Sequence, residues 1–511
     1  MATTINLSNL GAAGVRLLGG AAGDAAGFSV AGGSDVNGDG IADIVIGAAG
    51  TSGSYAGAAY IVFGTASGFT NDLDLGSLGT SGTAFTGAAN ARTGFSVAMP
   101  GDVNDDGIND ILIGNGGGIG GGVGETNQAY LIFGGGSLPT TLTSGSLGAN
   151  GLILEGPIIS DAGSAVAGAG DFDNDGIVDF LIGAPRGNNT YVIYGSGSLG
   201  DDIDLSTAPG FASEPGYSLA GGGDINGDGI DDIIVASHDI LSSGNGGYGA
   251  AVVFGTATRF ATGTSLDPIG AAGFRLTTAD DGDQLGTDAA ILGDVNGDGI
   301  DDLAVFAGRI TTPNGPQSGA AVLVYGSAGL GADIDVNNLG AAGVLLHDAF
   351  VGRVSDAGDF NGDGINDILI GNALYNTVYV VFGRDGGFGG DIDIDELADD
   401  EGMMIVGPNG QTASGLGSDG LGNAMAAIGD VNNDGFDDIL LGAPTADAAG
   451  DNAGAAYIIF GFSNAPQTLA GGGDADTLTG GGGNDTISGG GGHDLLIAGG
   501  GDDQITGDDG D

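Results

Sequence analysis

Short apolar segments rich in β-branched and aromatic residues recur through residues 1–462, and glycine, asparagine and aspartate separate them. In the first repeat these segments cover residues 27–31, 44–48 and 58–64, and a fourth run lies upstream at residues 14–18. Segments of this length and composition predict β-strands rather than helices. Four strands in each of seven repeats are typical of the blades of a β-propeller, so we expect an all-β fold of this kind.

The two ends of this repeat region are incomplete in complementary ways. The chain begins with the upstream run alone, and the seventh repeat stops after residues 456–461 without an outer strand of its own. We therefore predict that the N-terminal strand near residues 15–18 lies beside residues 457–460 and completes the last blade. This closure would leave no open sheet edge in a seven-bladed ring that covers residues 1–462.

A nine-residue acidic loop stands between the first two predicted strands of every repeat. The first copy begins at Asp35 and reads Asp-Val-Asn-Gly-Asp-Gly-Ile-Ala-Asp; the other six begin at Asp102, Asp171, Asp224, Asp294, Asp359 and Asp430. Every copy has an acid or amide at positions one, three and five, glycine at position six and Asp at position nine. Oxygen ligands at alternate positions around a sharp turn are what Ca²⁺ requires.

We assign five calcium ligands to each loop: the side-chain oxygens of positions one, three, five and nine, and the backbone carbonyl of position seven. These ligands are Asp35, Asn37, Asp39, Ile41 and Asp43; Asp102, Asn104, Asp106, Ile108 and Asp110; Asp171, Asp173, Asp175, Ile177 and Asp179; Asp224, Asn226, Asp228, Ile230 and Asp232; Asp294, Asn296, Asp298, Ile300 and Asp302; Asp359, Asn361, Asp363, Ile365 and Asp367; and Asp430, Asn432, Asp434, Phe436 and Asp438. Glycine at position six should take a positive φ angle. We expect the apolar side chain of position seven to enter the blade.

Other interpretations of the loops fit less well. An EF-hand needs Glu at position twelve between two helices, and position twelve of the first loop is Ile46 in a predicted strand. Mg²⁺ prefers a tighter octahedral site that retains water. Metal-free turns rich in Asp and Asn would explain the residue types. Acidic side chains that keep the protein soluble would explain the negative charge. Neither alternative explains the same spacing in seven copies.

From Gly471 onward the pattern changes to a nine-residue period of the form G-G-x-G-x-D-x-U-x, with two full copies at residues 480–488 and 489–497. This is the pattern of the calcium-binding parallel β-roll of RTX proteins. We predict a linker at residues 463–469 and a β-roll at 470–511. The expected carboxylate ligands are Asp476, Asp485, Asp494 and Asp503, and the expected inward-facing residues are Leu478, Ile487, Leu496 and Ile505. A disordered glycine-rich linker is the alternative. Because the last repeat is partial, we expect the chain to be a piece of a longer protein.

Composition excludes several classes of protein. The formal net charge is -58 with only 8 Lys and Arg residues, so the surface repels nucleic acid and anionic lipid. Cysteine is absent, which rules out disulfides and thiolate metal sites. No apolar run approaches the roughly 18 residues of a transmembrane helix. The N-terminus lacks a cleavable signal pattern, yet weak calcium sites fill only at extracellular calcium concentrations. We therefore expect export by another route.

The residues at the end of each repeat resemble those of a known family of repeats. Phe-Gly ends five repeats and Tyr-Gly ends two, and Gly-Ala-Pro follows the loop strand at residues 183–185 and 442–444. This pattern resembles the FG-GAP repeats that form the seven-bladed head of integrin α subunits. The resemblance implies that the acidic loop joins the first two strands of a blade and binds Ca²⁺. Integrins carry such loops in only some blades, whereas all seven repeats have one here. The integrin ligand-binding role needs a partner β subunit, so it does not transfer.

The sequence favours a binding module over an enzyme. The three histidines are each followed by Asp, but no nucleophile elbow and no His-Glu-x-x-His zinc motif accompanies them. We expect a secreted calcium-binding protein, with about seven Ca²⁺ in the propeller and several in the tail, that folds on calcium binding and adheres to a cell-surface or matrix protein or glycan. The alternative is the non-catalytic portion of a larger exported RTX-type enzyme or toxin. The RTX resemblance implies bacterial type I secretion into the extracellular space.

Overall fold

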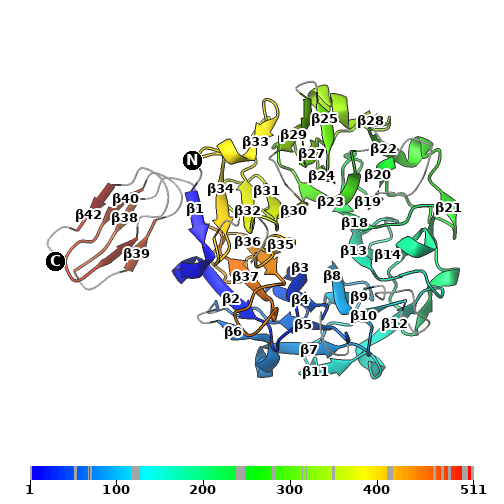
Figure 1. Cartoon of the computed structure of the whole chain (residues 1–511), viewed down its shortest axis with the longest axis horizontal. Coiled ribbons are helices and arrows are strands. Elements are labelled where there is room, and N and C mark those ends of the chain that lie inside the picture. Colours follow the sequence, from blue (N-terminus) through cyan, green and yellow to red (C-terminus); the bar gives the residue numbers. More distant parts are fainter. Residues whose placement is uncertain are drawn as a thin grey trace.

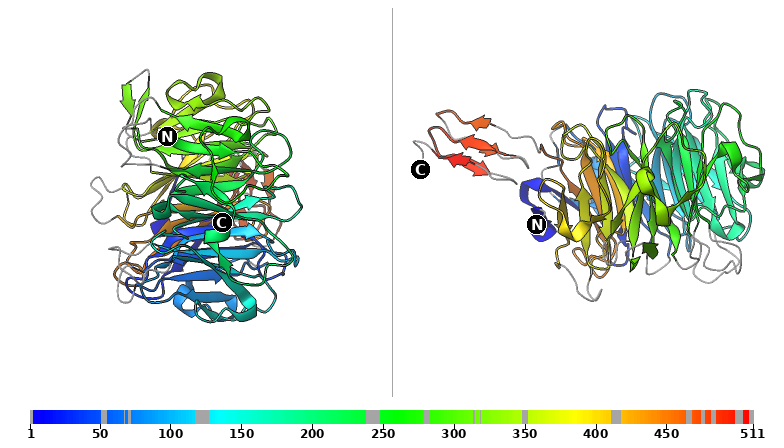
Figure 2. Two further views of the ribbon diagram at one scale, coloured as in Figure 1. Left: turned by 90° about the vertical axis from the view of Figure 1, so that its right-hand side faces the viewer. Right: turned by 90° about the horizontal axis from the view of Figure 1, so that it is seen from above.

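Seven five-stranded sheets form a ring, and a small roll of short strands lies outside it (Figure 1). The computed structural model describes residues 3–50, 55–66, 68–69, 72–116, 127–237, 248–278, 283–312, 315–317, 319–347, 352–410, 418–463, 468–473, 477–480, 485–497 and 504–507. Figure 2 shows the ring edge-on as a disc. The predicted all-β fold, a seven-bladed β-propeller with a C-terminal parallel β-roll, is confirmed.

We number the blades by the acidic loop that each contains and name their strands from the ring axis outward. Blade 1 consists of β3 (Ala26–Ser34), β4 (Asp43–Ala48), β5 (Ala58–Val62), β7 (Gly82–Thr86) and β11 (Thr141–Thr143). Blade 2 consists of β8 (Thr93–Gly101), β9 (Asp110–Asn115), β10 (Gln128–Ile132), β12 (Gly151–Glu155) and β16 (Ile203–Asp204). Blade 3 consists of β13 (Ala165–Gly170), β14 (Asp179–Ala184), β15 (Asn189–Ile193), β17 (Gly210–Ala212) and β21 (Thr264–Ser265).

The remaining four blades follow the same order. Blade 4 consists of β18 (Ser218–Gly223), β19 (Asp232–Ala236), β20 (Tyr248–Val253), β22 (Gly273–Thr277) and β28 (Ile334–Asp335). Blade 5 consists of β23 (Leu285–Gly293), β24 (Asp302–Ala307), β27 (Ala320–Val324), β29 (Gly343–His347) and β33 (Ile392–Asp393). Blade 6 consists of β30 (Arg353–Gly358), β31 (Asp367–Asn372), β32 (Thr377–Val381), β34 (Gly402–Val406) and β1 (Thr3–Asn6). Blade 7 consists of β35 (Ala424–Gly429), β36 (Asp438–Ala443), β37 (Ala455–Ile459), β2 (Gly14–Leu18) and β6 (Leu73–Asp74).

Each blade has five strands, not the four predicted from the sequence. The additional strand comes from the segment that leads to the outer strand of the next blade, and it pairs in parallel with the fourth strand, as β11 does with β7. These segments are only two to four residues long in the structure, too short to show a strand pattern in the sequence. They tie each blade to its neighbour through backbone hydrogen bonds.

The connections between these strands contain short 3-10 helices. They are η1 (Leu7–Asn9), η2 (Gly11–Ala13), η3 (Leu75–Ser77), η4 (Gly79–Ser81), η5 (Gly148–Asn150), η6 (Pro185–Gly187), η7 (Leu205–Thr207), η8 (Gly270–Ala272), η9 (Val336–Asn338), η10 (Gly340–Ala342) and η11 (Ile394–Glu396). A two-stranded hairpin of β25 (Ile310–Thr312) and β26 (Gly315–Gln317) extends from blade 5.

The hydrophobic core lies between blades rather than within one. All six residues of β4 are buried, because both faces of this strand pack against neighbouring blades. Strands buried on both faces read as continuous apolar runs. One cluster joins Ile46 of blade 1 to Leu440 and Ile458 of blade 7, and equivalent clusters fill other junctions of the ring. Each blade therefore depends on its neighbours for burial of its apolar surface.

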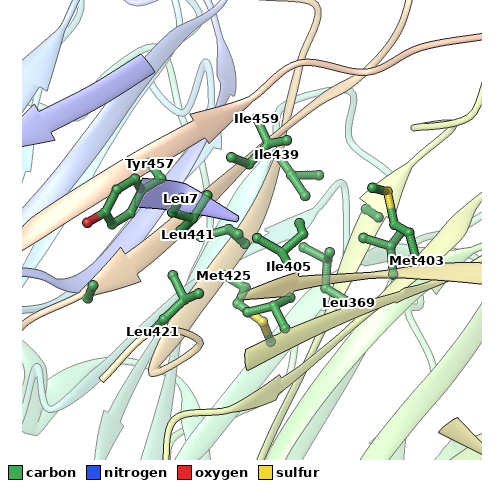
Figure 3. Packing of buried hydrophobic residues seen from close by; sticks show 14 of the residues in the cluster. Leu7, Leu369, Met403, Ile405, Leu421, Met425, Ile439, Leu441, Tyr457 and Ile459 are labelled. Carbon is green, nitrogen blue, oxygen red and sulfur yellow. The ribbon is translucent and has the colours of Figure 1, made fainter. Parts of the chain in front are cut away.

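The N-terminus closes the ring, as the incomplete ends of the repeat region predict. Strand β2 pairs antiparallel with β37, with Val15 opposite Ile458, and β1 pairs in parallel with β34 of blade 6. Leu7 lies between these strands and packs among Leu369, Ile405 and Tyr457 of the two last blades (Figure 3). Residues from both ends of the propeller thus share one core.

The tail forms a parallel β-roll of two sheets. One sheet contains β38 (Thr468–Ala470), β40 (Thr486–Ser488) and β42 (Gln504–Thr506), and the other contains β39 (Thr477–Thr479) and β41 (Leu495–Ile497). Successive nine-residue repeats alternate between the sheets. The roll begins at Thr468, so the last two residues of the predicted 463–469 linker belong to a strand.

Of the four apolar residues of the tail that were predicted to face inward, one is completely buried. Ile487 lies in the middle strand of its sheet and is completely buried. Leu478 and Leu496 are half-buried. Ile505 is 50% exposed, and its strand β42 lies at the edge of its sheet.

Candidate metal sites

All seven acidic loops lie on one face of the propeller. Each joins the first strand of its blade to the second, and its ninth residue opens the second strand, as Asp43 opens β4. Because consecutive strands of a blade are antiparallel, these connections all emerge at the same end of the blades. The next connections, between the second and third strands, emerge on the opposite face.

Backbone groups fix the shape of each loop around the carboxylate of position one. In the first loop, Oδ2 of Asp35 accepts the N–H of Gly40 at 2.6 Å and Oδ1 accepts the N–H of Asp39 at 3.2 Å. Gly40 has φ = 86°, and the six equivalent glycines also have positive φ, so the predicted conformation of position six is confirmed. A side chain at this φ would be penalised. Hydrogen bonds within the loop therefore fix its backbone conformation without a bound cation.

Position nine is a buried carboxylate in every loop. Asp43, Asp110, Asp179, Asp232, Asp302, Asp367 and Asp438 all have 0% exposure. Asp43 accepts the N–H of Val36 at 2.9 Å through Oδ2 and the N–H of Gly64 at 2.8 Å through Oδ1. Burial raises the pKa of Asp43 to about 7 despite these hydrogen bonds. Burial also raises the pKa to about 7 in Asp110, Asp179, Asp232, Asp302 and Asp438, and well above its usual range in Asp367.

The contact with Gly64 explains the glycine of the Phe-Gly or Tyr-Gly pair that closes each repeat. A Cβ atom on Gly64 would lie 2.2 Å from the carbonyl oxygen of Ala42 and 2.7 Å from Cγ2 of Ile41. Such distances are far below van der Waals contact, so only glycine can bring this N–H to the carboxylate of position nine. The end of the third strand and the acidic loop are therefore one structural unit.

The residue that anchors each loop in the core is at position two, which the sequence analysis did not single out. Val36, Val103, Phe172, Ile225, Val295, Phe360 and Val431 have exposures of 0–1%. Their regular apolar character between acidic neighbours is the signal that could have identified them. Position seven enters the blade only in part: Ile41 is half-buried, and its Cγ2 lies against the backbone of Gly64. The side chain of position two already fills the core below the loop.

Side chains of positions one, three and nine converge in the third loop. One carboxylate oxygen from each of Asp171, Asp173 and Asp179 lies within 4.8 Å of the other two, and no other group of three acidic or histidine side chains meets this spacing in the described part of the chain. Asp173 is the only aspartate at position three; the other loops have Asn there. Oδ1 of Asp173 is buried and has no hydrogen-bond partner. A bare, buried oxygen next to two further carboxylates fits a divalent cation.

Four of the six loops with asparagine at position three bring positions three and nine together. The side-chain amide of Asn37 donates to Oδ1 of Asp43 at 3.3 Å, and the equivalent distances are 3.4 Å for Asn226, 3.2 Å for Asn296 and 3.2 Å for Asn361. In the seventh loop, Oδ1 of Asn432 is buried without a hydrogen-bond partner. Positions three and nine therefore lie side by side in four of these loops, with the amide nitrogen of position three directed at the carboxylate.

The buried carboxylates predict how stability depends on pH when calcium is chelated. A carboxyl whose pKa is raised in the folded state stabilises the fold below its unfolded pKa, and this contribution is lost as pH rises through the folded pKa of about 7. In EDTA the melting temperature should therefore fall between pH 5 and pH 8, by at least about 5 °C. Calcium binds the ionised form, so the stabilisation by 5 mM CaCl₂ should grow over the same range. Melting curves at both pH values test this, and a flat profile in EDTA would contradict it.

The tail sites are described in part. Asp485 is fully buried and Asp494 is half-buried, each directly before a strand of the roll. Asp476 and Asp503 lie outside the described residues. In the described part of the chain, no helix has the length and apolar character needed to cross a lipid bilayer.

Comparisons with known proteins match both the propeller and the tail. The FG-GAP repeat matches residues 26–62, 162–200 and 422–459, and the RTX calcium-binding nonapeptide repeat matches residues 466–496 and 488–511. The chain is 29% identical over 226 residues to integrin alpha-5 of Xenopus laevis, a match that covers 42% of this chain and 20% of the integrin.

Two further relatives show the range of proteins that share this region. Integrin alpha pat-2 of Caenorhabditis elegans is 31% identical over 200 residues, covering 37% of this chain and 15% of that protein. Phosphatidylinositol-glycan-specific phospholipase D of Dictyostelium discoideum is 27% identical over 188 residues, covering 33% of this chain and 19% of that protein. The matches thus span a fifth or less of each relative's length.

Proposed function

We infer that this chain, which carries FG-GAP repeats homologous to those of integrin α subunits followed by RTX calcium-binding repeats, is a secreted adhesion or interaction module held in shape by calcium. The RTX repeats bind calcium and are typical of secreted proteins. We extend calcium binding to the seven propeller loops, because carboxylate oxygens converge in the third loop as a divalent cation requires and the other six loops share its residue spacing. In this proposal the chain has no catalytic site of its own.

The observation that supports a binding role is that the two faces of the propeller differ in their side chains. The acidic loops occupy one face. The exposed large apolar side chains described in the propeller, Tyr55, Ile158, Ile159, Tyr217 and Leu374, all lie in connections of the opposite face. Ile158 is 85% exposed and Ile159 is 50% exposed. Exposed apolar side chains gathered on one face mark a surface that binds a partner. We call this the apolar face.

Backbone strain supports this assignment. Ile159 has φ = 65°, a conformation that a β-branched residue rarely adopts. Strained residues of this kind cluster at binding sites, where the surrounding structure holds them in place. Ile159 stands at the third position of a turn in which the N–H of Ser160 donates to the carbonyl oxygen of Pro157 at 3.1 Å, and this turn leaves the Ile159 side chain 50% exposed.

The mouth of the central cavity adds aromatic and cationic groups to the apolar face. The cavity of about 530 Å³ runs along the ring axis, and the rings of Phe28 and Phe95 lie 4.8 Å apart beside it. The guanidinium of Arg92 lies 4.9 Å from the ring centre of Phe95. Tyr217 and Arg353 also line this cavity. Aromatic rings with adjacent hydrogen-bond donors suit a protein loop or a glycan on a cell surface or in the matrix.

Substitution of the apolar face should abolish partner binding without unfolding the chain. Binding of Ile158→Asp and Tyr217→Ala variants to arrays of immobilised glycans and matrix proteins should fall at least about fivefold, since hot-spot side chains contribute more than 1 kcal/mol each. Leu495→Ala is the matched control, because Leu495 is 57% exposed but lies in the roll. Equal binding by all variants, or no binding by the unmodified chain, would refute the proposal.

A second candidate function follows from the similarity to the phospholipase D of Dictyostelium discoideum. The chain would then be the non-catalytic portion of a larger exported enzyme or toxin of the RTX type. The complete gene sequence separates the two proposals: a hydrolase domain in the same reading frame supports the second candidate, and further repeats alone support the first.

A further inference from the structure

One of the eight basic residues of this acidic chain lies directly over an acidic loop. Arg259 stands in the segment that follows Phe254-Gly255 in blade 4, just before the apolar residue Phe260. Five other repeats have a small residue at this place, namely Gly68, Ser137, Ser198, Gly329 and Gly387. The first of these lies over the preceding blade's loop, since a Cβ on Gly68 would be 3.5 Å from Cβ of Asn432. An arginine at this place therefore reaches the loop of blade 3.

The guanidinium of Arg259 bridges two ligand positions of the third loop. Its Nε donates to Oδ2 of Asp173, at position three, and its Nη2 donates to Oδ2 of Asp175, at position five, at 2.6 Å. The ring of Tyr194 lies 4.7 Å below the guanidinium carbon and fixes its plane. The hydroxyl of Tyr194 in turn accepts the N–H of Phe260 at 2.9 Å. The arginine is thus held in a defined place.

The third loop differs from the other six in the residue that Arg259 contacts. It is the loop with Asp instead of Asn at position three, so it has an additional negative charge, and the repeat that contacts it supplies an additional positive charge. Both oxygens of Asp175 already accept a hydrogen bond: Oδ1 accepts the N–H of Ile177 at 3.0 Å, and Oδ2 accepts from Arg259. Position five is correspondingly missing from the converging group of Asp171, Asp173 and Asp179.

Asp173 nevertheless keeps one unpaired oxygen. Oδ1 of Asp173 is buried without a hydrogen-bond partner, and an oxygen of Asp173 lies within 4.8 Å of oxygens of Asp171 and Asp179. The Arg259 side chain is 49% exposed, so it can move into solvent without opening the core. A cation that binds to positions three and five must displace the guanidinium from Asp175.

We propose that Arg259 is a resident cation of the third loop, which holds positions three and five together in the absence of metal and competes with Ca²⁺ for the site. This inference rests on the proposed calcium binding by the propeller loops. It makes the third loop the last of the seven to fill with calcium and the one whose shape depends least on the metal.

The test is a calcium titration read out site by site. Crystals of the full chain and of the Arg259→Ser variant are equilibrated at limiting and at saturating CaCl₂, and the anomalous signal of calcium is measured in each loop. At limiting calcium the third loop of the unmodified chain should give the weakest signal. In Arg259→Ser the calcium concentration that half-fills this loop should fall roughly fivefold to tenfold, while the other six loops stay unchanged.

Arg384→Ser is the matched control. Arg384 stands in the equivalent segment of blade 6, but it pairs with Glu401 at 3.4 Å and stacks on Phe388 instead of contacting a loop carboxylate. A melting curve in EDTA gives a second measurement. Arg259→Ser should lower the melting temperature in EDTA but not in saturating calcium, and Arg384→Ser should shift both equally.

Each outcome decides the proposal. Equal filling of all seven loops in the unmodified chain, or an Arg259→Ser variant whose third loop fills at the same calcium concentration, would overturn it while leaving calcium binding by the propeller intact. No calcium signal in any loop at saturation would overturn the proposed function and this inference together.

Discussion

A chain that lacks residues 2–18 is expected to lose the cooperative melting transition of the propeller. The deletion removes β1 and β2, and with them the strand that covers the open edge of β37. It also removes Leu7, Val15 and Leu17, whose exposures are 1%, 5% and 0%. Burial of three such side chains contributes on the order of 5 kcal/mol, which is comparable to the whole stability of about 5–15 kcal/mol of a typical domain. Circular dichroism during heating measures the effect.

A synthetic peptide of residues 2–18, added in trans, provides the control. It should restore the transition, and a peptide of the same composition in scrambled order should not. If the truncated chain melts at the temperature of the full chain with equal cooperativity, the N-terminal strand does not close the ring in solution.

Removal of calcium is expected to have an effect of similar size. Calcium at tenfold excess over its dissociation constant stabilises the folded state by about 1.4 kcal/mol per site, or about 10 kcal/mol over seven loops. Without the metal, the carboxylates of each loop repel one another within a buried setting. We therefore expect EDTA to lower the melting temperature by more than about 10 °C, or to abolish the β-sheet signal altogether.

Two controls separate the loops from other effects of EDTA. Addition of excess CaCl₂ should restore the signal, and equimolar MgCl₂ should not, because Mg²⁺ demands a tighter geometry. An Asp485→Asn and Asp494→Asn double variant removes tail carboxylates and should retain most of the response. Identical spectra and melting temperatures in EDTA and in millimolar CaCl₂ would show that calcium does not hold the propeller together.

The sequence predicted those parts of the structure that repeat. The acidic loop recurs seven times with fixed internal spacing, and the second strand and the Phe-Gly or Tyr-Gly closure recur in every repeat. The structure explains each by a local requirement, such as the hydrogen bond from the N–H of Gly64 to Asp43. The closure by β2 was predictable because the two ends of the repeat region lack complementary parts. The parallel fifth strands were missed, because segments such as Ile334–Asp335 are too short to show alternation.

Features that depend on contact between repeats were not predictable from the pattern of one repeat. The side chain at position two of each loop, for example Phe172, is buried in the core between blades. The packing, not the sequence, shows that position two rather than position seven anchors the loop. Arg259 meets Asp173 across 86 residues, a pairing that no local motif reveals. The apolar face gathers side chains from different blades, and the topology alone brings them to the same end of the strands.

Equilibrium dialysis with ⁴⁵Ca²⁺ tests calcium binding by the propeller loops directly. The full chain is compared with Asp224→Ala and Asp294→Ala variants, each of which loses the position-one carboxylate that accepts the N–H of the loop glycine at 2.7 Å. Each variant should bind one calcium ion fewer per chain than the unmodified protein. Equal uptake by all three proteins would show that the fourth and fifth loops bind no calcium, and would contradict the assignment of all seven loops as metal sites.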